Sequence, residues 1–207
     1  MLPITLRQDG RRALVVGGGP VAARKAETLA AAGYRVFVVA KAVADERLHA
    51  LALPHRVAVR AYTATDVDGA ALVIAATGDD AVDACVVSDA RKAGAIACDA
   101  GHPERGDFHM PATVRRGELT ISVDSAGASP PFSKRVAKEL ADSIGPEYGD
   151  AVRTLATMRD AVKAAIAPER RRDVLRALSA LPAGELAAMD AGAMQHAIED
   201  AARASVS

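Results

Sequence analysis

Residues 13–25 read ALVVGGGPVAARK, which is an apolar run, three glycines and a stretch of helix-forming residues. Gly17, Gly19 and Ala22 give the spacing G-x-G-x-x-A between the expected strand and the expected helix. In a dinucleotide-binding βαβ unit the first glycine makes the tight turn, the second lets the backbone approach a pyrophosphate, and the small third residue lets the helix pack on the strand. The free N–H groups at the helix start then face the phosphates. The stretch predicts nucleotide binding; the alternative is a tight turn that binds nothing.

Candidate cofactor contacts follow from the same arrangement. The glycine turn and the first helical residues supply one group, and residues after the second and fourth strands supply the rest. The full set is Gly17, Gly18, Gly19, Pro20, Val21, Ala40, Lys41 and Thr77. NAD enzymes often carry an acidic residue after the second strand, where it binds the ribose hydroxyls, but this chain has Lys41 there. A lysine at that position can also meet the 2′-phosphate of NADP.

Composition narrows the class of protein. Half of the 207 residues are hydrophobic, the formal net charge is zero, and aromatic residues make up 3% with no Trp. Bulk attraction to nucleic acid and a base-stacking platform are therefore not expected. Cys85 and Cys98 lack C-x-x-C spacing and lie in apolar surroundings, which favours two buried free thiols. We find no leader pattern and no uncharged stretch of the ~18 residues that a membrane span needs, and we expect a cytoplasmic protein without a membrane partner.

Strands and helices alternate through the first half of the chain. We expect strands at 13–16, 35–40, 57–61, 72–75 and 95–98, and helices at 21–32 and 80–93. Strands separated by helices predict a parallel sheet with right-handed crossovers, so the fold class is α/β with a Rossmann-like domain over residues 1–107.

The pattern changes after this domain. Expected strands at 108–113 and 119–124 flank a turn, and a helix runs from Ser129-Pro130-Pro131 to about residue 143. Phe132, Val136 and Leu140 share one face of that helix. This small α+β unit, 108–145, is too small for a stable core alone, so we expect a homodimer built mainly by it. Residues 146–207 are expected to form a helical C-terminal domain.

Three motifs occur together in one known family. They are VVGGGPVAARK at 15–25, AATGDD at 75–80 and SAGASP at 125–130, and the opening Leu2-Pro3-Ile4 also fits. Over roughly residues 2–165 the chain resembles the precorrin-2 dehydrogenases, some of which are also sirohydrochlorin ferrochelatases of sirohaem synthesis. The resemblance implies a Rossmann domain, a dimerisation domain and a small helical domain, and a homodimer that binds a tetrapyrrole. It also implies NAD⁺-dependent removal of a hydride from precorrin-2 to give sirohydrochlorin, with Fe²⁺ insertion in bifunctional members. Family members tolerate the missing acidic residue, and the precedent favours NAD over NADP.

The catalytic segment departs from the family pattern. The family places an aspartate after the fifth strand in a run like N-V-V-D-x-P, where this chain reads CDAGHP at 98–103. Counting forward puts His102 on the aspartate position and counting back puts Gly101 there, so the aspartate is absent in either register. Asp99 and His102 are the catalytic candidates, because a carboxylate or an imidazole can accept the proton that the reaction releases. The alternatives are a turn cap for Asp99 and a solvent-facing loop for His102.

Metal and substrate contacts can also be proposed. His102, His109, Asp99 and Asp107 match no tight zinc spacing, so no resident metal site is expected, and His109 is interpreted as structural. Precorrin-2 carries many carboxylates, which guanidinium and ammonium groups can hold. The substrate candidates are Arg115, Arg116, Lys134, Arg135 and Ser125. An ordinary solvated helix face and a turn cap are the alternatives.

Three functions remain open on these residues. The leading hypothesis is a precorrin-2 dehydrogenase. The second is a chelatase that inserts Fe²⁺ or Co²⁺. The third is a nucleotide- or tetrapyrrole-binding protein without catalysis, an alternative that the altered segment 98–103 keeps open.

Overall fold

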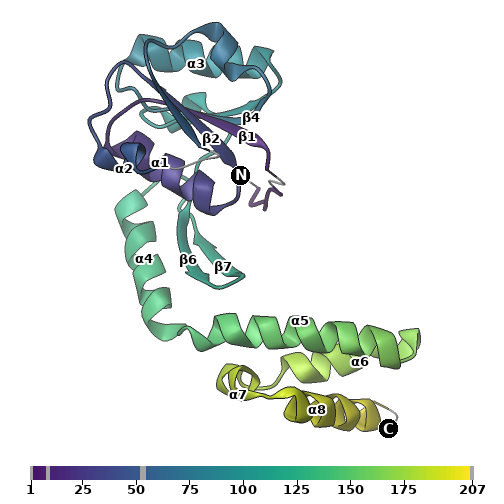
Figure 1. Cartoon of the computed structure of the whole chain (residues 1–207). Helices are drawn as coiled ribbons and strands as arrows, with labels where there is room; N and C mark the ends of the chain where they lie inside the picture. Colours follow the sequence, from purple (N-terminus) through teal and green to yellow (C-terminus); the bar gives the residue numbers. More distant parts are fainter. Residues whose placement is uncertain (1, 8–9, 52–54, 206–207) are drawn as a thin grey trace. The chain divides into compact units, whose positions relative to one another are not determined.

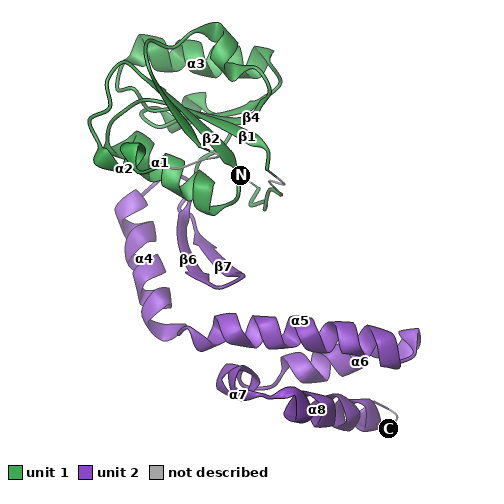
Figure 2. Ribbon diagram, in the orientation of Figure 1, with its two compact units in different colours: residues 1–110 green, residues 111–207 purple. Residues whose placement is uncertain are grey.

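The chain forms two compact units, residues 1–110 and 111–207 (Figure 2). The computed structural model describes residues 2–7, 10–51 and 55–205. The predicted division at 145/146 falls inside the second unit and stays a prediction.

Unit 1 is a parallel five-stranded sheet in the order β3-β2-β1-β4-β5. Its elements are β1 (Arg12–Val16), α1 (Pro20–Ala31), β2 (Arg35–Ala40), α2 (Glu46–His49), β3 (Arg56–Val59), the 3₁₀ turn η1 (Ala64–Val67), β4 (Ala70–Ala75), α3 (Asp80–Lys92), β5 (Ile96–Asp99) and the 3₁₀ turn η2 (Pro103–Arg105). The predicted α/β Rossmann-like class is confirmed. The strand order reverses between β1 and β4, which is the point where ligands bind in such sheets.

Alternation along β1 explains why both faces of the sheet are covered. Ala13 and Val15 join the core beneath α1, and Leu14 and Val16 join the core beneath α3. Figure 1 shows these two helices on opposite faces of the sheet. A strand buried on both faces reads as a continuous apolar run, as residues 13–16 do.

Unit 2 combines a hairpin with five helices. Its elements are β6 (Ala112–Arg116), β7 (Leu119–Val123), α4 (Pro130–Ser143), α5 (Glu147–Ala165), α6 (Pro168–Ser179), α7 (Ala183–Ala188) and α8 (Ala191–Ala204). The strands pair antiparallel around Gly117-Glu118, and α4 packs against them. The last four helices enclose a core that includes Met158, Val162 and Leu178.

Two details of the predictions are wrong, and a third stays open. The first strand after the sheet begins at Ala112 instead of residue 108, because Phe108 and Met110 pack against the core beneath α1. On α4 the buried residues are Ser133 and Ala137, and Phe132 is 51% exposed in the single chain, so its predicted role in a homodimer stays a prediction. Cys85 is exposed on α3, because the buried positions of that helix belong to its neighbours Asp83, Val86, Val87 and Ala90; both cysteines are free.

Candidate functional site

The glycine turn joins β1 to α1, and its three glycines have different roles. Gly17 has φ +139°, and a Cβ there would overlap the carbonyl oxygen of Ala76. A Cβ on Gly18 would overlap the carbonyl oxygen of Ala42. Gly19 has open space within 4 Å of the position of its Cβ. The first two glycines therefore serve the fold, and the third leaves room for a ligand.

The N-terminus of α1 has no anion of its own. Gly19 caps the helix without a side-chain hydrogen bond, Pro20 opens it, and no acidic residue lies in the first turn. In α3 the Asp79 Oδ1 accepts hydrogen bonds from Ala81 N (3.1 Å) and Val82 N (3.2 Å). Of these two helices, both of which start at the carboxyl edge of the sheet, α1 is the one that offers free N–H groups and the positive end of its dipole to a phosphate.

A pocket of about 260 Å³ opens beside this helix start. Of the predicted cofactor contacts, Gly17, Gly18, Gly19, Ala40, Lys41 and Thr77 line it, whereas Pro20 and Val21 do not. The structure adds lining residues that the sequence analysis missed: Val16, Val39, Ala42, Ala44, Tyr62, Asp79 and Val82. The loop after β2 is held to the glycine turn by Ala44 N, which donates to Gly18 O at 2.9 Å.

The pocket fits a nicotinamide dinucleotide. It crosses the switch point of the sheet, contains a glycine-lined opening, and abuts the bare helix N-terminus. Tyr62 supplies its aromatic wall and donates from Oη to Asp89 Oδ2 at 3.1 Å. Burial, and then the nearby Asp89 carboxylate, raise the pKa of Tyr62, so its phenol stays neutral. Lys41 is the lining residue at the end of β2, where dinucleotide folds bind the adenosine ribose.

Asp99 lies at the end of β5, beside Ala75 at the end of β4. Its Oδ1 accepts hydrogen bonds from Gly101 N (3.0 Å) and His102 N (2.8 Å). Its Oδ2 is buried and has no hydrogen-bond partner among the described residues; Arg105 Nη1 lies 3.8 Å away. Asp99 therefore fixes the loop after β5 and presents His102 at the edge of the sheet.

The His102 imidazole lies between two carboxylates. Its Nε2 is 2.9 Å from Asp80 Oδ1, and its Nδ1 is 3.1 Å from Glu104 Oε1. The side chain is 37% exposed, so substrate can reach it. The pKa of Glu104 is lowered, first by the hydrogen bond of its own backbone N–H and then by His102. The sequence analysis missed Asp80 as a partner of His102, because the two residues lie on different elements.

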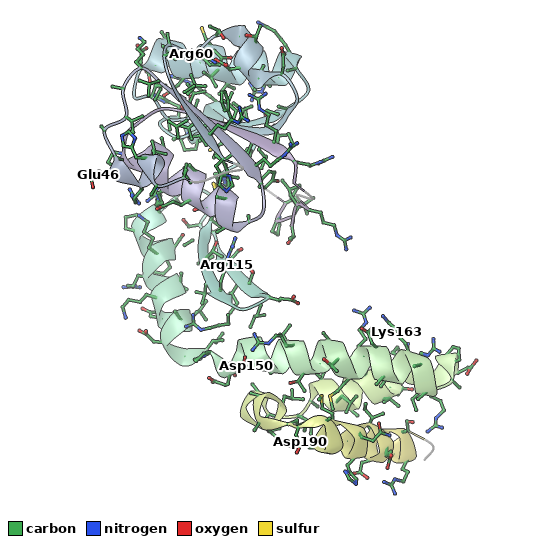
Figure 3. All side chains as sticks on the ribbon, in the orientation of Figure 1. Glu46, Arg60, Arg115, Asp150, Lys163 and Asp190 are labelled. Atoms are coloured by element: carbon green, nitrogen blue, oxygen red, sulfur yellow. The ribbon has the colours of Figure 1, made fainter. Side chains whose placement is uncertain are left out.

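The candidate substrate-binding residues in unit 2 differ in whether they already contact other residues. Arg116 donates from Nε to Ile144 O (2.8 Å) and from Nη2 to Ala141 O (2.6 Å), which caps the end of α4. Arg135 stacks on the Phe132 ring at 4.7 Å and pairs with Glu139 at 3.4 Å. Arg115 (labelled in Figure 3) and Lys134 are exposed and make no ion pair with another described residue. Arg115, Lys134 and Arg135 therefore remain candidates for binding the substrate, whereas the Arg116 guanidinium is already hydrogen-bonded at the end of α4.

Ser125 is engaged in the loop before α4. Its Oγ accepts a hydrogen bond from Ser129 N at 3.1 Å and from Ser133 Oγ at 2.9 Å. Ser129, in turn, accepts from Phe132 N and caps the helix. These contacts match the turn-cap alternative, and the hydroxyl of Ser125 keeps one hydrogen to donate.

The loop before α4 contains a strained alanine. Ala126 has φ +56°, a conformation that costs a residue with a Cβ roughly 1–2 kcal/mol. Ala126→Gly is therefore expected to raise the free energy of unfolding by about 1 kcal/mol, after the entropy cost of the new glycine. Denaturant titration of both proteins measures this difference. A variant less stable than wild type would show that the loop conformation is set by other contacts.

The described residues, 2–7, 10–51 and 55–205, also lack two kinds of feature. No three His, Cys, Asp or Glu side chains gather there as ligands for a metal ion. Among the same residues, no helix has both the length and the apolar character needed to cross a bilayer.

Comparisons with known proteins agree with this geometry. Residues 4–112 match a family described as "Putative NAD(P)-binding". The siroheme synthase of Methylococcus capsulatus is 36% identical over 98% of this chain and 42% of its own length. The siroheme synthase of Pseudomonas entomophila is 39% identical over 79% of this chain and 35% of its own length. The chain thus spans less than half of each of these curated relatives.

One solved structure gives the same fold. The structure described as SirC, precorrin-2 dehydrogenase, superposes with a TM-score of 0.76 and covers 98% of this chain and 100% of its own. Its sequence is 23% identical to this chain, so the similarity shows a shared fold.

Proposed function

Because the chain belongs to the precorrin-2 dehydrogenase and sirohydrochlorin ferrochelatase family, we propose that it oxidises precorrin-2 to sirohydrochlorin in sirohaem synthesis, with NAD⁺ as the cofactor. The observation that carries the proposal is the glycine-lined pocket at the bare N-terminus of α1, with an imidazole at the neighbouring sheet edge. The pocket supports a nicotinamide dinucleotide, and family precedent favours NAD over NADP.

Different residues of the chain bind the cofactor and accept the proton. Bound NAD⁺ supplies the acceptor for the hydride that leaves the tetrapyrrole. The first N–H groups of α1 bind the pyrophosphate, and Gly19 leaves it room to approach. His102 accepts the proton that accompanies the oxidation and passes it to water. Asp99 holds the loop that presents His102.

Charged residues of unit 2 are proposed to hold the tetrapyrrole. Its carboxylates suit the guanidinium groups of Arg115 and Arg135 and the ammonium group of Lys134. Fe²⁺ insertion is the proposed second reaction, because His102 can take the pyrrole N–H protons that the metal displaces. Fe²⁺ is here a substrate and needs no resident site.

The proposal is tested by mixing purified protein with anaerobically prepared precorrin-2 and NAD⁺ or NADP⁺. NAD⁺-dependent formation of sirohydrochlorin, followed by its absorbance and by NADH fluorescence, supports it. Metal-dependent spectral change without nicotinamide reduction supports the chelatase alternative. Tetrapyrrole binding without turnover supports the non-catalytic alternative.

A homodimer is the proposed assembly, with residues 108–145 as its main interface. Phe132 supports it, because its ring is half exposed on α4 while its neighbours Ser133 and Ala137 are buried. Light scattering at micromolar concentration is expected to give the mass of two chains, and Phe132→Asp is expected to shift the protein toward one chain. A wild-type monomer at that concentration would contradict the proposal.

A further inference from the structure

Helix α3 contributes an aspartate to the His102 environment. Asp80 is the first residue of this helix, and its Oδ1 lies 2.9 Å from Nε2 of His102. The two residues come from the segments after β4 and β5, which are neighbouring strands. The contact therefore joins two adjacent loops at the carboxyl edge of the sheet.

The Asp80 carboxylate is held in place by more than the imidazole. Its Oδ2 lies 3.6 Å from Nη2 of Arg105, and Nη1 of Arg105 lies 3.8 Å from the buried Asp99 Oδ2. A negative charge in the first turn of a helix is also favoured by the helix dipole. The Asp80 carboxylate is therefore a positioned acceptor that faces Nε2 of the ring.

Glu104 faces the other ring nitrogen with fewer ion pairs than Asp80. It lies in the short turn η2, and its side chain is 70% exposed, the same fraction as that of Asp80. Among the described residues His102 is its one ion-pair partner. The Nδ1 side of the ring is therefore the side that an arriving substrate can uncover.

The pair also lies beside the proposed cofactor pocket. Asp79 precedes Asp80 and Val82 follows in the same turn, and both line the pocket. Thr77 lines it from the same loop, and the hydrogen bonds of Thr77 N and Oγ1 to Asp83 Oδ1 (3.0 and 2.7 Å) fix that loop to α3. A change in the side chain of Asp80 thus acts at the pocket edge without removing a pocket wall.

We propose that Asp80 is a positioning residue for His102. Its carboxylate accepts the Nε2–H of the imidazole. When the arriving substrate displaces Glu104 from Nδ1, the lone pair of Nδ1 takes the proton from the tetrapyrrole. The proton moves from the substrate to Nδ1, Asp80 stabilises the resulting imidazolium, and Nδ1 then releases the proton to water. No electrons pass through the pair. This inference rests on the proposed function, since it assigns the orientation of the base that the proposed reaction uses.

The test compares Asp80→Asn with Asp200→Asn. Asp200 is a matched control because it is a helical aspartate of similar exposure, 74% against 70%, and it is also paired with an arginine. In Asp80→Asn the amide can donate to Nε2, which favours the Nδ1–H tautomer. We expect kcat to fall roughly 10- to 100-fold with KM for NAD⁺ unchanged. Asp80→Glu is expected to restore part of kcat, and Asp200→Asn to match wild type.

A second readout does not depend on turnover. Two-bond ¹H–¹⁵N NMR spectra report which ring nitrogen of His102 carries the proton. We expect the Nε2–H form in wild type and in Asp200→Asn, and its loss in Asp80→Asn. An unchanged tautomer in Asp80→Asn, or a kcat equal to that of Asp200→Asn in an active enzyme, overturns the inference. If wild type itself does not oxidise precorrin-2, the proposed function fails, and the NMR spectra still decide whether Asp80 orients the ring.

Discussion

Gly19→Val is expected to abolish NAD⁺ binding while the protein stays folded. The φ and ψ angles of Gly19, −92° and −177°, suit a β-branched residue, and apart from its two chain neighbours no described residue has an atom within 4 Å of the position of its Cβ. The added side chain would occupy the space through which the backbone approaches the pyrophosphate. Isothermal titration calorimetry with NAD⁺ measures the loss, and circular dichroism with a thermal melt checks the fold.

Two further glycines make this experiment specific. Gly184→Val is the matched control, because the position of its Cβ is also free of neighbours but lies in α7 of unit 2. It is expected to bind NAD⁺ as wild type does. Gly17→Val is expected to unfold or strongly destabilise the protein, because its φ of +139° alone costs a side chain about 1–3 kcal/mol and its Cβ meets the Ala76 carbonyl. The sequence analysis gives Gly17 the tight turn and Gly19 the approach to the pyrophosphate, and the different surroundings of their Cβ positions agree with this division. Wild-type affinity in a folded Gly19→Val protein would refute the assignment of the pocket.

His102→Ala is expected to lower the rate of sirohydrochlorin formation by roughly 10²- to 10⁴-fold, the usual cost of removing a general base. Because His102 is absent from the pocket lining, the affinity for NAD⁺ should remain that of wild type. Steady-state NADH formation with precorrin-2 gives the rate, and calorimetry gives the affinity. His49→Ala, at an exposed position of α2, serves as the control.

Comparing Asp99→Ala with His102→Ala shows whether the loop after β5 acts in catalysis or only maintains the structure. Asp99→Ala removes the acceptor of two backbone N–H groups, so it is expected to cost about 1–3 kcal/mol of stability as well as activity. His102→Ala should leave the unfolding midpoint close to that of wild type. The variant that carries both Asp99→Ala and His102→Ala should be assayed for NADH formation and, separately, for metal insertion. Rates near wild type in both assays would mean that the loop after β5 only shapes the site.

The family and the fold class were predictable from short local patterns. The identification from three motifs is confirmed by the match over residues 4–112 and by the similarity to the siroheme synthases. The sheet was predictable because residues 13–16, 36–40 and 72–75 are apolar runs in strands covered on both faces, and such runs can be recognised without knowing which strands pair. Glycine spacing predicted the turn, although the steric need for Gly17 and Gly18 comes from the carbonyl groups of Ala76 and Ala42, which lie far from them in the sequence.

Features that depend on distant contacts were not predictable. Residues 108–111 have strand-like composition, but the core of unit 1 takes the side chains of Phe108 and Met110. Within the single chain the hairpin packs against α4, whose buried residues are Ser133 and Ala137, and the role of the Phe132 face stays a prediction. Asp80 and Tyr62 reach the site only through loops that meet at the sheet edge, so the spacing of residues along the chain carries no signal for them.

The caps of α1 and α3 have a consequence for how a ligand is oriented. Both helices start at the same edge of the sheet and direct the positive ends of their dipoles toward it. Without their caps, the two N-termini would compete as binding sites for an anion. At the N-terminus of α3, the Asp79 carboxylate already accepts hydrogen bonds from the free N–H groups. At the N-terminus of α1, Gly19 has no side chain to do so, and the N–H groups stay available to a ligand. An asymmetric ligand with one pair of phosphates then has a single direction in which to lie across the sheet. A carboxylate at the start of α3 and the absence of a side chain at the start of α1 thus give the site its polarity.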